Sequence, residues 1–206
     1  MNSDVSIIIT NYNYGKYITR CIRSCREQFN HIPEIIVVDD NSDDDSLEKM
    51  TPFIKDITLI KSSTNIGVAA AANLGIQAAK GQFVVRVDAD DFINQNLAFF
   101  MRTYLVANLD AFCVSCDYHL VDEYGEETER RYSEVNPIAC GIMYRRDLLW
   151  ELGGYNSDMR HREEEELRKR LGVKYNIHHL KIPFYRYRMH NSNKTKLDEY
   201  KSWKID

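Results

Sequence analysis

The sequence predicts an α/β protein with a mostly parallel central sheet, because two patterns alternate along its first half. Short, wholly apolar runs are typical of parallel strands that are buried on both faces. The segments between them carry apolar residues at helical spacing, so helices are expected on both faces of the sheet. With 206 residues, the chain suffices for one substantial domain, and we expect a single domain over residues 1–206.

The elements of the first half are expected in alternating order. The expected strands are Val5–Ile9, Glu34–Asp40, Ile57–Ser62 and Gln82–Asp88, and the expected helices are Lys16–Phe29, Asp45–Ile54 and Gly67–Lys80. The last helix is rich in alanine, the residue that most favours helix. This order predicts helical connections between neighbouring parallel strands.

The second half is less regular. It predicts a helix at Leu97–Ala107, a strand at Ala111–Val121, a charged and mobile loop at Asp122–Pro137, an apolar segment at Ile138–Asn156, a charged helix at His161–Gly172 and an aromatic, basic segment at Tyr175–Thr195. The charged helix ends at a glycine, which is common at helix C-termini. No internal repeat, low-complexity tract or linker divides the chain.

Composition limits the classes of function. Apolar residues make up 44% and charged residues 28%, as in ordinary soluble domains. The formal net charge of −4 argues against a general nucleic-acid binder, which is usually basic. No run approaches the ~20 apolar residues of a membrane span, and no secretory signal opens the chain. We expect a cytoplasmic protein, and peripheral membrane association through a partner or a lipid-linked substrate stays open.

Five cysteines favour reduced thiols, because the count is odd and no secretory signal is seen. Cys113 and Cys116 have the C-x-x-C spacing of some zinc and redox sites. They lie in an expected strand, where residues three apart point to opposite faces. We therefore expect packing cysteines rather than a zinc site.

Polar residues follow each of the first four expected strands. They are Tyr12 and Asn13, then Asp39, Asp40 and Asn41, then Asn65, and finally the acidic cluster that begins at Asp88. Ligands of parallel sheets bind at the carboxyl ends of the strands. The sequence therefore predicts one binding site along this edge of the sheet.

The acidic cluster consists of Asp88, Asp90 and Asp91, whose charges repel one another. The chain has no P-loop, no G-x-G-x-x-G turn and no G-x-S-x-G elbow. Clustered carboxylates suit Mg²⁺ or Mn²⁺, which commonly bridge protein carboxylates and substrate phosphates. The simpler alternative is a solvated turn with helix-capping aspartates.

The order of several segments resembles family 2 glycosyltransferases of the GT-A fold. These segments are "VSIIITNYNYGKYITRCIRS", "IIVVDDNSDDDS", "TNIGVAAAANLGIQAAKGQFVVRVDADDF" and "LGGYN…REEEELRKRL", and the resemblance runs from about Val5 to about Lys194. It implies an αβα sandwich and a metal-dependent, inverting enzyme that uses nucleotide-diphosphate sugars. It also implies a nucleotide-binding half over 1–95 and an acceptor-binding half over 96–206.

The resemblance implies roles for residues along the expected edge. Donor binding is implied for Thr10, Tyr12, Asn13, Asp39, Asn65 and Asp88. The Tyr12 ring would stack on the nucleotide base, as its flat face allows. The Asp39 carboxylate would accept a hydrogen bond from the base, commonly a uracil imide. Asp88 would approach the ribose or the metal.

The same resemblance implies a metal site. Asp90, the second acid of the D-x-D motif, would hold Mn²⁺ or Mg²⁺ with Asp88 and His190, while Asp91 would support the loop. Arg188 or Lys194 would add positive charge near the diphosphate. The alternative for His190 is a surface histidine on a basic tail. His178 and His179 are expected to be structural, because neighbouring strand residues point opposite ways.

The catalytic base is implied by the family pattern E-D-x-x-L-x-x-R. Matching Leu167 and Arg170 places Glu163 and Glu164 on the acidic pair, with Glu164 where aspartate is usual. Glu165 is the alternative, because four glutamates in a row leave the register open. The simpler explanation is a helix start whose acids favour the positive end of the dipole.

One departure from the family concerns an arginine. The family often has A-R-N in the alanine-rich helix, and this chain has Ala71-Ala72-Asn73. A donor-binding contact is therefore missing or supplied from elsewhere.

The resemblance implies transfer of a sugar, UDP-linked as is common in the family, to an acceptor hydroxyl in cell-surface polysaccharide or lipopolysaccharide synthesis. Residues 122–137 would order over the donor, and Cys140-Gly141 would form a floor of small residues. The alternatives are a catalytically inactive nucleotide-sugar-binding protein and a nucleotidyltransferase.

Overall fold

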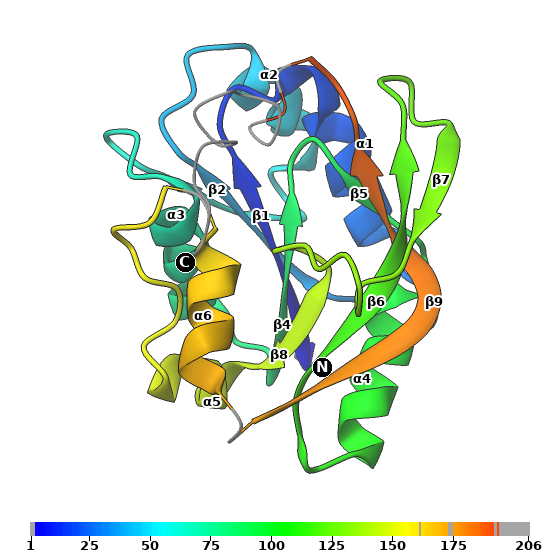
Figure 1. The fold of residues 1–206 in the computed structure, drawn as a ribbon. Helices are drawn as coiled ribbons and strands as arrows, with labels where there is room; N and C mark the ends of the chain where they lie inside the picture. The colour runs from blue at the N-terminus through cyan, green and yellow to red at the C-terminus, as the bar shows by residue number, and fades with distance from the viewer. Residues whose placement is uncertain (1–2, 161, 173–174, 192, 194–206) are drawn as a thin grey trace.

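The computed structural model describes residues 3–160, 162–172, 175–191 and 193. Within them lie the strands β1 (Val5–Asn11), β2 (Glu34–Asp39), β3 (Thr58–Lys61), β4 (Phe83–Asp88), β5 (Phe92–Ile93), β6 (Ala111–Val121), β7 (Glu127–Arg131), β8 (Ile142–Arg145) and β9 (Asn176–Arg188). All join one sheet in the order β3-β2-β1-β4-β8-β6-β9-β5, with β7 paired to β6 (Figure 1).

The first four strands of the chain are parallel, as their apolar sequences predict. Asn11 of β1 lies opposite Asp39 of β2, and Thr10 lies opposite Asp88 of β4. The carboxyl ends of these strands therefore meet at one edge of the sheet. The predicted α/β fold with a mostly parallel sheet is confirmed.

Helices cover both faces of the sheet and give the αβα layers. They are α1 (Gly15–Arg26), α2 (Ser46–Met50), the short 3₁₀ helix η1 (Thr51–Phe53), α3 (Val68–Ala78), α4 (Leu97–Ala107), α5 (Arg146–Glu151) and α6 (Glu163–Leu171). Ile7 and Ile9 of β1 pack into the core formed with α1 and α4, whereas Ile8 packs into the core formed with α3, α5 and α6. This alternation follows the two-residue period of a strand.

The second half departs from its expected outline in two places. Residues 127–131, expected within a loop, form β7, which pairs antiparallel with β6. This edge strand exposes most of its charged side chains, so it has no apolar alternation to reveal it. In addition, β8 runs antiparallel between β4 and β6, and so places residues 137–140 beside the edge of the first four strands.

The cysteine prediction is confirmed. The described chain holds five free, buried cysteines, and Cys113 and Cys116 of β6 pack into the two opposite cores. Burial raises the pKa of each of these two thiols to about 12. Such thiols stay protonated at neutral pH and pack as small apolar groups.

Within the described residues, every helix is too short or too polar to cross a bilayer.

Candidate functional site

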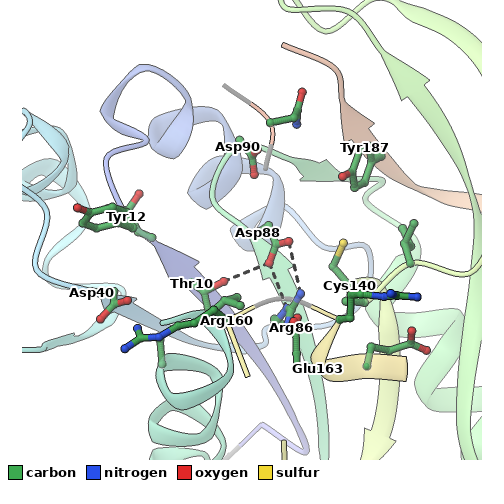
Figure 2. Close-up of a pocket in the computed structure, with 18 of the residues that line it drawn as sticks. Thr10, Tyr12, Asp40, Arg86, Asp88, Asp90, Cys140, Arg160, Glu163 and Tyr187 are labelled. Carbon is green, nitrogen blue, oxygen red and sulfur yellow. Dashed lines mark hydrogen bonds and ion pairs between the residues drawn. The ribbon is translucent and has the colours of Figure 1, made fainter. Parts of the chain in front are cut away.

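A pocket with a volume of about 280 Å³ opens at the carboxyl edge of the sheet. Its walls come from the ends of β1 and β4, the first turn of α3, residues 137–140 and the start of α6 (Figure 2). The pocket thus lies at the carboxyl ends of the strands, where parallel sheets bind their ligands. The walls formed by residues 137–140 and by α6 come from segments distant in sequence.

Tyr12 and Thr10 form part of one wall. Tyr12 keeps 38% of its surface exposed, so one face of its ring is accessible to a flat ligand. Thr10 donates its hydroxyl to Oδ1 of Asp88 at 3.1 Å. The structure thus brings these three predicted donor-binding residues to one pocket.

The other three predicted donor-binding residues are not among the described residues that line the pocket. The buried Asp39 carboxylate accepts hydrogen bonds from Asn11 Nδ2 at 2.8 Å and Ser42 Oγ at 2.7 Å. Asn13 accepts at its Oδ1 a hydrogen bond from the Asp43 amide, and Asn65 donates to the Asp40 carbonyl at 3.4 Å. Their roles in donor binding stay predictions.

Asp40, the neighbour of Asp39, does line the pocket. Its two carboxylate oxygens accept hydrogen bonds from the amides of Ile66 at 2.7 Å and Gly67 at 2.8 Å. Gly67 has φ +89°, and an added Cβ would lie 2.7 Å from Nη1 of Arg160. Glycine therefore allows both the turn and the close approach of Arg160 at the N-terminus of α3.

The three clustered aspartates have different surroundings. Oδ2 of Asp90 lies 2.9 Å from Nε2 of His190, and both side chains are buried. Asp91 accepts hydrogen bonds from the Tyr185 hydroxyl and the Arg188 amide, both at 2.7 Å. Asp91 thus fixes the loop against β9, whereas Asp88 and Asp90 line the pocket.

These residues fit a divalent cation. Carboxylate oxygens suit Mg²⁺ and Mn²⁺, and an imidazole nitrogen suits transition metals. Here the Asp90 and His190 atoms are in hydrogen-bond contact with each other. Among the described residues, Asp88, Asp91 and Cys140 also form a group whose possible ligand atoms lie within 4.8 Å of one another. That group differs from the predicted set by two members, and the predicted set stays a prediction.

The cluster is electrostatically costly without a counter-charge. Burial, and then the neighbouring Asp90 and Asp88 charges, raise the pKa of Asp91 well above its usual value. Burial also raises the pKa of Asp88, although the Arg86 guanidinium opposes this shift. Folded protein therefore binds more protons here than the unfolded chain at pH values above 3.8, and its free energy of unfolding falls as pH rises through that range.

Asp91→Asn should reduce this pH dependence. Without added metal, we expect the melting temperature of the wild type to fall relative to that of the variant as the pH rises above 3.8, the usual pKa of aspartate. The variant is the reference for the wild type, because the two proteins share all other titrating groups. Melting curves in the presence of a chelator measure the difference, and parallel pH profiles would contradict the assignment of a raised pKa to Asp91.

The first residues of α6 bring three glutamates to the opposite wall. Each pairs with a different arginine: Glu163 with Arg86 at 2.6 Å, Glu164 with Arg168, and Glu165 with Arg162 at 2.8 Å. Glu163 and Glu164 are only 3% and 4% exposed. These carboxylates lie on the opposite side of the pocket from Tyr12 and Asp90, and a carboxylate is a group that can accept a proton.

Three further observations concern basic residues. Arg86 and Arg160 line the pocket but were absent from the predicted set. Arg86 is recognisable as a charge within the apolar run "VVRVD", whereas no pattern marks Arg160. The buried Arg188 donates to the carbonyls of Asp90 and Glu123, so its charge is held inside the loop structure. Lys194 lies outside the described residues.

Comparison with known sequences gives two matches of interest. The profile of "Glycosyl transferase family 2" matches residues 6–169. The glycosyltransferase GlyG of Streptococcus pneumoniae is 32% identical over 126 residues, which cover 60% of this chain and 42% of GlyG. The chain thus spans less than half the length of this relative.

Comparison with solved structures supports the fold. The 1–349 fragment of S. aureus TarS in complex with UDP-GlcNAc has a TM-score of 0.79 and 21% identity, over 100% of this chain and 62% of that fragment. The mannosyltransferase PcManGT of Pyrobaculum calidifontis, solved with GDP-Man and Mn²⁺, has a TM-score of 0.74 and 20% identity, over 94% of this chain and 59% of PcManGT. Both share the fold of this chain.

Proposed function

Because the chain belongs to glycosyl transferase family 2, we propose that it transfers a sugar from a nucleotide-diphosphate donor to an acceptor hydroxyl with inversion at the anomeric carbon. One observation carries the proposal. A single pocket contains an accessible aromatic ring at Tyr12, the paired acids Asp88 and Asp90, and buried carboxylates at the start of α6. The ring suits the nucleotide base of the donor, the paired acids suit its diphosphate with a metal ion, and the buried carboxylates suit an acceptor hydroxyl.

The proposed donor is a UDP-sugar that stacks its base on Tyr12. TarS, which shares the fold, binds UDP-GlcNAc, and this supports the choice of nucleotide. The acceptor is a sugar, glycan or glycolipid, and the reaction belongs to cell-surface polysaccharide or lipopolysaccharide synthesis. These assignments rest on the family.

Mn²⁺ or Mg²⁺ would be held by Asp90 with Asp88 and His190. When bound, such a cation supplies positive charge that neutralises a departing nucleoside diphosphate. PcManGT, which shares the fold, was solved with Mn²⁺, and this supports the choice of metal. Asp91 fixes the loop that carries Asp90, through the hydrogen bonds that it accepts from the Tyr185 hydroxyl and the Arg188 amide.

Glu164 is proposed as the general base. Its carboxyl group lines the pocket, and Arg168, one turn further along α6, pairs with it. The acceptor hydroxyl gives its proton to Glu164, and its oxygen attacks the anomeric carbon from the side opposite the diphosphate. The new glycosidic bond forms as the bond to the diphosphate breaks, which inverts the configuration.

Binding of donor can be tested with a panel of nucleotide sugars. We expect UDP-sugars with Mn²⁺ to raise the melting temperature, because a ligand at a hundred times its Kd adds about 2.7 kcal/mol to the free energy of unfolding. Omission of Mn²⁺ should remove most of the shift. A shift of equal size with any nucleotide sugar and no dependence on metal would contradict the proposed donor site.

Arg160 is proposed to contact the donor diphosphate. Arg86 and Arg162 are each paired with carboxylates, whereas the described contacts of Arg160 are with oxygens of Asn65, at 3.4 and 3.5 Å. Arg160→Gln should therefore weaken donor affinity about tenfold, the loss of one charge-assisted contact of ~1.4 kcal/mol. Titration calorimetry measures it.

Arg131→Gln is the matched control, since Arg131 lies on β7 outside the pocket lining and pairs with Glu129. We expect its donor affinity to equal that of the wild type. Equal affinities for the wild type and Arg160→Gln would remove Arg160 from the donor site.

A further inference from the structure

Arg86 occupies a position on β4 that faces a protein core. Its neighbours Val85 and Val87 point to the core beneath α1 and α4, so Arg86 shares the other face with Val84 and Asp88. Its side chain is only 5% exposed. A buried arginine is costly unless nearby carboxylates neutralise its charge, so its charged partners explain its presence.

The partners of Arg86 belong to the two sides of the pocket. Nη1 donates to Oε1 of Glu163 at 2.6 Å, and Nη2 donates to Oδ2 of Asp88 at 3.5 Å (Figure 2). Nε lies 3.1 Å from Oδ1 of Asp88 in an ion pair that lacks hydrogen-bond geometry. The guanidinium also lies over the Tyr155 ring, with 5.6 Å to the ring centroid. Although burial lowers the pKa of Arg86, the Asp88 and Glu163 carboxylates raise it well above its usual value, which keeps the group charged.

This bridge links two elements that are far apart in sequence. Asp88 ends β4 beside the acidic cluster, and Glu163 is the first residue of α6, directly before the proposed base Glu164. A planar guanidinium can hold both carboxylates at fixed angles, which a lysine cannot. We propose that Arg86 is a positioning residue that sets the start of α6, and with it Glu164, relative to the acidic cluster. This inference rests on the proposed function.

Arg86→Met tests the positioning role. Met keeps an unbranched apolar stem but removes the bridge, so we expect kcat to fall about 100-fold with donor Kd changed less than about threefold. Arg145→Met is the matched control, because Arg145 is a half-buried sheet arginine that donates only to backbone carbonyls of residues 105, 108 and 111 among its described contacts. It should lower the melting temperature without changing kcat, which is what a purely structural role of Arg86 would also give.

Arg86→Lys is the second variant, because a lysine keeps the buried charge but cannot hold both carboxylates at fixed angles. We expect kcat to fall about tenfold in Arg86→Lys, so this variant decides the matter if Arg86→Met does not fold. An unchanged kcat in folded Arg86→Met or in Arg86→Lys overturns the inference.

A readout without turnover separates this inference from the proposed function. Amide hydrogen exchange over residues 163–166 should accelerate about tenfold in Arg86→Met and stay at the wild-type rate in Arg145→Met. If the wild-type protein shows no glycosyl transfer, this result contradicts the proposed function but not the positioning role of Arg86. Unchanged exchange in Arg86→Met counts against the positioning role, whatever the activity.

Discussion

Asp90→Asn should lower the turnover of glycosyl transfer by about 10³-fold, because charge stabilisation of this kind contributes several kcal/mol. Asn preserves the shape of the side chain and can still bond to His190, which lies 2.9 Å from Asp90. Only the negative charge is removed, so the fold should remain, with the free energy of unfolding unchanged or increased as repulsion within the acidic cluster falls. Initial rates over a range of Mn²⁺ concentrations measure the effect.

Asp110→Asn is the matched control for this variant. Asp110 also pairs with a histidine, His178, at 3.5 Å, but neither residue lines the pocket. Its rate should equal that of the wild type. Full activity of Asp90→Asn at ordinary Mn²⁺ concentrations would show that Asp90 holds no essential metal, and the roles given to Asp88 and His190 would then be wrong as well.

Glu164→Gln should lower kcat by about 10³-fold with donor KM changed less than about threefold, because loss of a general base affects the transition state rather than the bound donor. The base must face the pocket and be ionised. Glu164 lines the pocket, is 4% exposed and is paired with Arg168. Single-turnover rates with saturating donor measure the chemical step.

Glu166→Gln is the control, since Glu166 forms a comparable pair with Arg170 one turn along α6 and does not line the pocket. Its kcat should be that of the wild type. A large loss in Glu165→Gln together with an active Glu164→Gln would mean that the register of the four glutamates is shifted by one. Glu165 would then be the general base in place of Glu164.

The sequence predicted where the first half of the site lies, because apolar strands end at polar residues and parallel register places Thr10 beside Asp88. It did not predict which of these polar residues line the pocket, since Asp39 was expected there and its neighbour Asp40 lines it instead. Successive residues point to different sides, and only the turn beyond β2 decides that Asp39 contacts Asn11 and Ser42 while Asp40 faces the pocket.

The rest of the site was less predictable from the sequence, because it depends on strand pairing between distant segments. The insertion of β8 beside β4 brings Cys140 to the pocket, and no local period encodes this neighbour. Charged side chains concealed β7, which appears as a loop in the sequence. In the sequence, Arg86 interrupts an apolar strand without an evident partner. The fold supplies that partner, because Glu163, which is 77 residues later in the chain, accepts a hydrogen bond from Arg86 at 2.6 Å.

The products released from a UDP-sugar, an acceptor and Mn²⁺ test the central claim most directly. The account predicts nucleoside diphosphate in equal amount to a new glycoside of inverted configuration, formed by the wild type and reduced about 10³-fold in Asp90→Asn. Release of pyrophosphate would instead indicate nucleotidyl transfer. Metal-dependent binding of the donor without any product would indicate an inactive nucleotide-sugar-binding protein and would contradict the assignment of Glu164 as a general base.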